Sequence, residues 1–129
     1  METLTISEFR ERFGTATERR RELCARFEEW LAVAAGTGLL RRVWVYGSFV
    51  SAKLDPNDVD ALVLTHSGYE IEELPAAIQP YFRQEVLRMA WELDIFIMPV
   101  GKSDPYIDDV RQVLARGRQG NGVMLEVEI

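Results

Sequence analysis

Three aspartates and a Gly-Ser pair are the residues of this chain whose types and spacing point most directly to chemistry. Gly47 and Ser48 end an apolar run, and nine residues separate Ser48 from Asp58, which lies two positions before Asp60. Side chains two positions apart in a strand point to the same face, so we expect the carboxylates of Asp58 and Asp60 to lie side by side. Such carboxylates repel each other unless a cation lies between them or one is protonated. The pair therefore predicts half of a divalent-metal site.

A third aspartate, Asp94, lies in the apolar run Leu93–Ile97. An ionised carboxylate among apolar neighbours is costly without a partner, and a metal shared with Asp58 and Asp60 on a neighbouring strand would supply one. Mg²⁺ binds a few carboxylate oxygens together with waters and substrate phosphates. Two such ions about 4 Å apart can activate an attacking hydroxyl and stabilise a leaving group. We predict that these three aspartates are metal ligands and catalytic residues of a site for Mg²⁺ or Mn²⁺.

Gly47, Ser48 and Lys53 are predicted to bind the phosphates of a nucleotide. A glycine lets the backbone approach a triphosphate closely. Ser48 is expected to cap a short helix that begins at Phe49, with its hydroxyl and the free backbone N–H groups turned to phosphate oxygens. Lys53 lies between the two motifs, where its ammonium would neutralise phosphate charge.

The remaining pattern predicts the helices and strands that position these residues. Capping boxes at Thr5–Glu8 and Thr15–Glu18 predict a short helix and then a longer one ending near Ala35. Apolar, β-branched and alternating runs predict strands, and Gly and Pro residues mark the turns between them. The expected strands are 42–46, 58–65, 93–98 and 123–129, and the expected later helices are 80–91 and 104–117.

This order of helices and strands predicts a single mixed α/β (α+β) domain over residues 1–129, with helices packed on a small mixed sheet. N-terminal helices occupy residues 5–35, the core occupies 42–99, and a C-terminal helix and strand occupy 104–129. A chain of 129 residues is long enough for one core and too short for a second.

Composition and net charge limit which compartment and which partners we expect for this protein. The net charge of −6 argues against nonspecific binding to long DNA or RNA, which needs a basic surface. Arg19, Arg20 and Arg21 are clustered, and we interpret them as a solvated helix face. The sequence contains one cysteine, no secretory signal and no apolar run near the ~20 residues of a membrane span. We therefore expect a cytoplasmic protein that does not associate with membranes.

The Gly47-Ser48 turn, the Asp58-Val59-Asp60 motif and the later Asp94 strand together resemble the nucleotidyltransferase superfamily typified by DNA polymerase β. The resemblance spans about residues 42–99, and the short chain is most similar to the minimal nucleotidyltransferases and to a small bacterial and phage nucleotidyltransferase-like group. It implies that the three aspartates bind the metals and that the Gly-Ser turn holds a nucleoside triphosphate.

One departure from the family's pattern concerns the residues after the Gly-Ser turn. Minimal nucleotidyltransferases that act as antitoxins often carry Arg-Gly there, whereas this chain has Ser51-Ala52-Lys53-Leu54. Two functions therefore stay open. The first is an enzyme that transfers a nucleoside monophosphate from a nucleoside triphosphate to a hydroxyl on a partner protein, an RNA end or a small molecule. The second is a catalytically weak or inactive binding module, such as an antitoxin-like partner of a toxin or a regulatory subunit.

Overall fold

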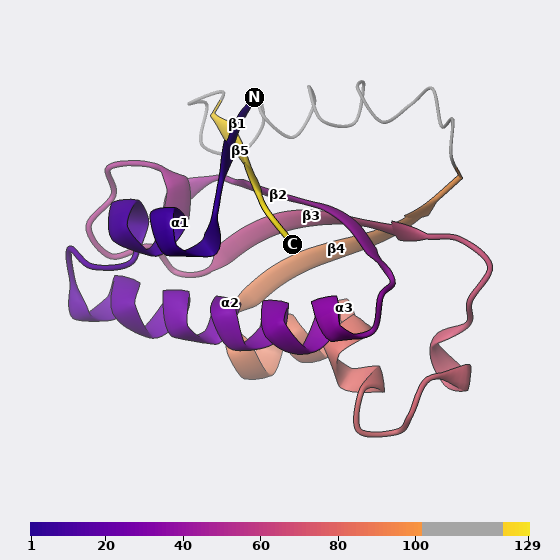
Figure 1. Ribbon diagram of the computed structural model, residues 1–129. Helices are drawn as coiled ribbons and strands as arrows, with labels where there is room; N and C mark the ends of the chain where they lie inside the picture. The colour runs from indigo at the N-terminus through magenta and orange to yellow at the C-terminus, as the bar shows by residue number, and fades with distance from the viewer. Residues whose placement is uncertain (102–122) are drawn as a thin grey trace.

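The computed structural model describes residues 1–101 and 123–129, which form one five-stranded mixed sheet with helices on one face (Figure 1). The strand order is β1-β5-β2-β3-β4. The mixed α/β fold predicted from the sequence is confirmed. The strands are β1 (Glu2–Leu4), β2 (Leu40–Tyr46), β3 (Val59–His66), β4 (Leu93–Val100) and β5 (Met124–Val127).

The pairing of the strands follows from how the chain connects them. The short loop after β2 returns the chain antiparallel as β3, and β4 then pairs parallel to β3 after a longer connection, as parallel pairs require. β5 lies antiparallel to β2, and β1 lies parallel to β5. Because β3 and β4 are parallel, both strands begin at the same edge of the sheet.

Two N-terminal helices cover one face of the sheet. Helix α1 (Ile6–Phe13) has the predicted capping box, in which Thr5 accepts from the Glu8 N–H at 3.1 Å and Glu8 accepts from the Thr5 N–H at 2.9 Å. Helix α2 (Glu18–Gly36) begins where expected, but its cap residue is Thr17. The prediction of Thr15 as part of a capping box is therefore wrong. The Thr15 hydroxyl instead donates to the carbonyl of Glu11 in α1.

The connection from β3 to β4 is less regular than predicted. The sequence predicts a helical region from about Glu70 that Pro75 and Pro80 interrupt, with a helix over 80–91. The connection contains four short pieces instead, and the helix expected over 80–91 is broken at Arg83, whose backbone is extended. It ends at Glu92, whose φ of 57° is left-handed and turns the chain into β4. The pieces are two 3₁₀ turns (Ile71–Glu73 and Gln79–Phe82), α3 (Gln84–Val86) and a π-helical turn (Leu87–Trp91).

Apolar side chains line both faces of the sheet. The main core joins α1 and α2 to odd-numbered residues of β2, β3, β4 and β5, and it includes the fully buried Phe9, Phe27 and Trp30. A second cluster on the other face contains Trp44, Tyr46, Leu62, Leu64, Val100 and Met124. β5 was predicted to bury one face only, and the 8% exposure of Met124 shows that it buries both.

The other sequence predictions have mixed outcomes. β1 was not predicted, because a three-residue strand is too short to show a periodic pattern. The helix expected over 104–117 lies outside the described residues. Within the described residues, none of the helices combines the length and the apolar character that crossing a membrane requires.

Candidate metal site at the start of β3 and β4

The three predicted aspartates converge where β3 and β4 begin. Asp60 and Asp94 are register partners in the parallel pair, and Asp58 lies two positions before Asp60. Each of the three offers a carboxylate oxygen within 4.8 Å of the other two. Asp60 is 4% exposed and Asp94 is 6% exposed, while Asp58 is half-buried. This spacing brings three anionic groups close enough to coordinate the same cation.

Gly47 lies directly against this cluster. It follows β2 with φ 81° and ψ −155°, a backbone conformation that is nearly restricted to glycine. A Cβ atom built on Gly47 would lie 2.6 Å from Asp60 Oδ2. The glycine thus serves two purposes, since it permits the turn and leaves room for the Asp60 carboxylate.

Gln84 forms a hydrogen bond with one carboxylate of the cluster. The side-chain amide of this residue, the first of α3, donates to Asp94 Oδ1 at 3.2 Å. A hydrogen bond to one oxygen of a metal-binding carboxylate fixes how that carboxylate presents its other oxygen. Sequence reasoning missed Gln84, because its ten-residue separation from Asp94 carries no pattern.

A buried arginine, Arg20 of α2, organises the loop after the Gly-Ser turn. Its guanidinium donates to backbone carbonyls of the loop, at 2.7 Å to Phe49, 2.9 Å to Ser51 and 3.0 Å to Lys53. It is 4% exposed, and this burial lowers the pKa of Arg20 from its ordinary value. The interpretation of the arginine cluster as a solvated face is therefore wrong for Arg20. The hint missed in the sequence is that Arg20 precedes Leu23, Phe27 and Trp30 at helical spacing on the buried stripe.

Arg19 bonds to both of the segments that lead into the two aspartate-bearing strands. It donates to the backbone carbonyls of Pro56 and Asn57 and forms an ion pair with Glu92, the residue before β4. Arg26 also pairs with Glu92 at 2.8 Å. Hydrogen bonds from these two arginines lower the pKa of Glu92 to about 2. The Val59 N–H adds a backbone bond to the Glu92 carbonyl at 3.2 Å.

The predicted phosphate-binding residues lie in the connection between β2 and β3, which leads to the aspartates. The cap bond that was expected from the Ser48 side chain is absent. Ser48 is 4% exposed, and it does not cap the following 3₁₀ turn (Ser48–Val50), whose cap residue is Gly47 with no side-chain cap bond. The prediction that Ser48 caps a helix is therefore wrong. Lys53 is exposed, and Arg20 holds its backbone carbonyl. The roles of Gly47, Ser48 and Lys53 in binding phosphate stay predictions.

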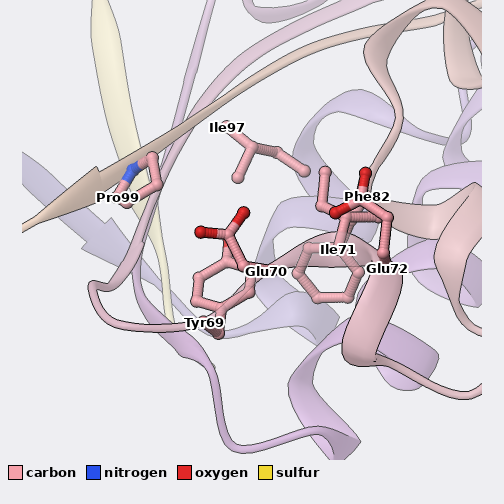
Figure 2. A pocket seen from close by; sticks show the side chains of 7 residues that line it. All are labelled: Tyr69, Glu70, Ile71, Glu72, Phe82, Ile97 and Pro99. Carbon is pink, nitrogen blue, oxygen red and sulfur yellow. The ribbon is translucent and has the colours of Figure 1, made fainter.

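A pocket of about 260 Å³ elsewhere in the molecule is separate from the aspartates. Figure 2 shows its lining, which includes Tyr69, Phe82, Ile97 and Pro99. Ile97 and Pro99 are odd-numbered residues of β4, whereas Asp94 is even-numbered, and alternate side chains of a strand point to opposite faces. The pocket therefore opens on the face of β4 that Asp94 does not use.

Fold and site together define a small mixed α/β domain with a three-carboxylate cluster beside a glycine turn. A model of the family of unknown function DUF6932 matches residues 2–127, and the chain belongs to this family. Comparisons with curated proteins and with solved structures find no match.

Proposed function

We propose that this protein is a metal-dependent nucleotidyltransferase whose catalytic metal ligands are Asp58, Asp60 and Asp94. The observation that carries the proposal is the convergence of three carboxylates within 4.8 Å at the start of two parallel strands. Three oxygen donors of this kind, two of them buried, fit Mg²⁺ or Mn²⁺ better than softer metals. Bound there, the divalent ions would neutralise the charge of a triphosphate and of the leaving group.

The reaction follows from what such a site can hold. A hydroxyl of the acceptor attacks the α-phosphorus of a nucleoside triphosphate, the bond from that phosphorus to the bridging oxygen breaks, and pyrophosphate leaves. The hydroxyl proton passes to solvent. Phosphoryl-group chemistry of this type depends mainly on positioning and charge stabilisation. The chain supplies these through the three carboxylates, of which that of Asp60 lies in the space that Gly47 leaves, and through the loop that ends at Lys53.

The acceptor and the setting of the reaction belong to the same proposal. We propose that the acceptor is a hydroxyl of a partner protein or of an RNA end. A toxin-like partner is one such protein, and the cytoplasm, with its supply of nucleoside triphosphates, is the proposed compartment.

Two measurements on matched variants test this function. Asp60→Asn removes one charge from the cluster, whereas Asp55→Asn removes the same charge from an exposed position of the preceding loop. Thermal unfolding is recorded with and without Mg²⁺ or Mn²⁺. An ion at 100 times its Kd stabilises the folded state by about 2.7 kcal/mol. We expect wild type and Asp55→Asn to respond to the ion, and Asp60→Asn to lose most of the response.

The second measurement is transfer of label from each of the four nucleoside triphosphates to candidate acceptors, including the products of neighbouring genes. Wild type and Asp55→Asn should release pyrophosphate and label an acceptor, and Asp60→Asn should not. If the ions bind at the aspartates but no nucleotide binds or reacts in the full scan, the enzyme proposal is wrong. The protein would then be a binding module that retains the fold.

A further inference from the structure

Arg20 is the one side chain of α2 that reaches the whole length of the loop after the Gly-Ser turn. Its guanidinium donates to the carbonyls of Ser48, Phe49, Ser51 and Lys53, and also to that of Phe13 at the end of α1. Its carbon Cζ lies 5.1 Å from the centre of the Phe49 ring. One buried group therefore fixes the backbone direction at four of the six loop positions from 48 to 53.

Turning these carbonyls inward has a consequence for the amide groups of the same peptides. In a trans peptide the C=O and the following N–H point in opposite directions, and the described residues contain no cis peptide. The N–H groups of the exposed residues Ala52 and Leu54 consequently point away from the Arg20 guanidinium, whereas that of Phe49 is buried with the rest of the residue. Backbone N–H groups that face outward from a turn can donate to phosphate oxygens, and the intervening amide of Lys53 is bonded within the loop to the Ser51 hydroxyl.

The chemistry of arginine suits this arrangement and that of lysine does not. The planar guanidinium spreads its donors over three nitrogens, whereas a lysine ammonium donates from a single atom. None of the ion pairs found among the described residues involves Arg20. Its hydrogen bonds are to neutral carbonyls, and the carboxylate that acts on its charge is that of the exposed Asp55. A positive charge therefore lies beneath the loop and favours an anion on the other side.

We propose that Arg20 is a positioning residue of the nucleotide site, which holds loop 48–53 so that its outward N–H groups bind the phosphates of the nucleoside triphosphate. This inference rests on the proposed function and deepens it.

The test compares Arg20→Lys and Arg20→Met with Arg21→Met. Arg21 is the exposed neighbour of Arg20, and its guanidinium donates to the Thr15 carbonyl at 3.0 Å. Binding of Mn²⁺ alone, and of ATP or another nucleoside triphosphate with Mn²⁺, is measured by calorimetry at a temperature where circular dichroism shows each variant folded. We expect Arg20→Lys to weaken triphosphate binding at least 10-fold, a difference of about 1.4 kcal/mol, with little change in Mn²⁺ binding. Arg21→Met should bind both as wild type does.

A second measurement covers the case in which the Arg20 variants do not fold. In ¹⁵N-labelled wild type, addition of a nucleoside triphosphate with Mg²⁺ should shift the amide signals of Ala52 and Leu54. If a folded Arg20→Lys binds the triphosphate as tightly as wild type, or if these amides do not respond while others do, the inference about Arg20 is wrong and the proposed function stands. If wild type binds no triphosphate at all, both the proposed function and the inference about Arg20 are wrong.

Discussion

Replacing Gly47 by alanine tests two properties of the site with one methyl group. The first effect is backbone strain, because φ of 81° with ψ of −155° is a region almost confined to glycine. Holding another residue there costs about 1–3 kcal/mol. The second effect is steric, since the new Cβ would lie 2.6 Å from Asp60 Oδ2. Carbon and oxygen do not approach that closely, so the Asp60 carboxylate must move away from its position in the cluster.

Gly68→Ala is the matched control, because Gly68 has a similar φ of 89° but no atom within 4 Å of the added Cβ. Both variants should unfold more easily than wild type, by about 1–3 kcal/mol from strain. For a domain of this size, each kcal/mol corresponds to roughly 3–5 °C of Tm. The two variants should differ in their response to metal. Gly68→Ala should keep the full rise in Tm on addition of Mg²⁺ or Mn²⁺, and Gly47→Ala should lose most of it.

The assay is urea and thermal unfolding of the three proteins with and without the divalent ion. The reasoning is refuted if Gly47→Ala keeps both the stability of wild type and its response to metal. It is also refuted if Gly68→Ala loses the response to the same extent, because the loss would then follow general destabilisation instead of displacement of Asp60.

Two further predictions concern residues that position the aspartates. Gln84→Ala removes the donor to Asp94 Oδ1 and should weaken Mn²⁺ binding by roughly 10-fold, measured by calorimetry; unchanged affinity would show that Asp94 does not need this hydrogen bond. Hydrogen bonds from Arg19 and Arg26 lower the pKa of Glu92 to about 2. Ionised Glu92 therefore stabilises the fold at pH values above 4.5, the ordinary pKa of a glutamate, and this contribution is lost as the pH falls towards 2. Unfolding from pH 6 to pH 2 should therefore show a smaller loss of stability for Glu92→Gln than for wild type, and parallel losses would contradict the ion pair.

The sequence predicted those parts of the molecule that local patterns determine. The capping box at Thr5 and Glu8 and the apolar stripe of α2 indicated the N-terminal helices, and β-branched runs indicated β2, β3 and β4. The proximity of Asp58 and Asp60 follows from the two-residue period of a strand. The prediction that Asp94 lies beside them also assumed that its strand pairs with theirs. The parallel pairing of β3 with β4 confirms this assumption.

Other features depend on the tertiary structure, and the sequence carries at most a hint of them. Arg20 belongs by type to the surface, and only the fold shows that a loop 28 to 33 residues further along the chain supplies the carbonyls that it needs. The same holds for the bond from Gln84 to Asp94. The prolines Pro75 and Pro80 indicated two interruptions of the connection before β4, but no local pattern indicated the extended backbone at Arg83 that divides the rest of it.

The most direct test of the metal site is a crystal soaked with Mn²⁺ and a non-hydrolysable nucleoside triphosphate, with anomalous scattering used to locate the manganese. We predict at least one manganese peak within coordination distance of oxygens from Asp58, Asp60 and Asp94, with the triphosphate lying between that ion and loop 48–53. A peak at another place, or a nucleotide bound away from the aspartates, would contradict the proposed site.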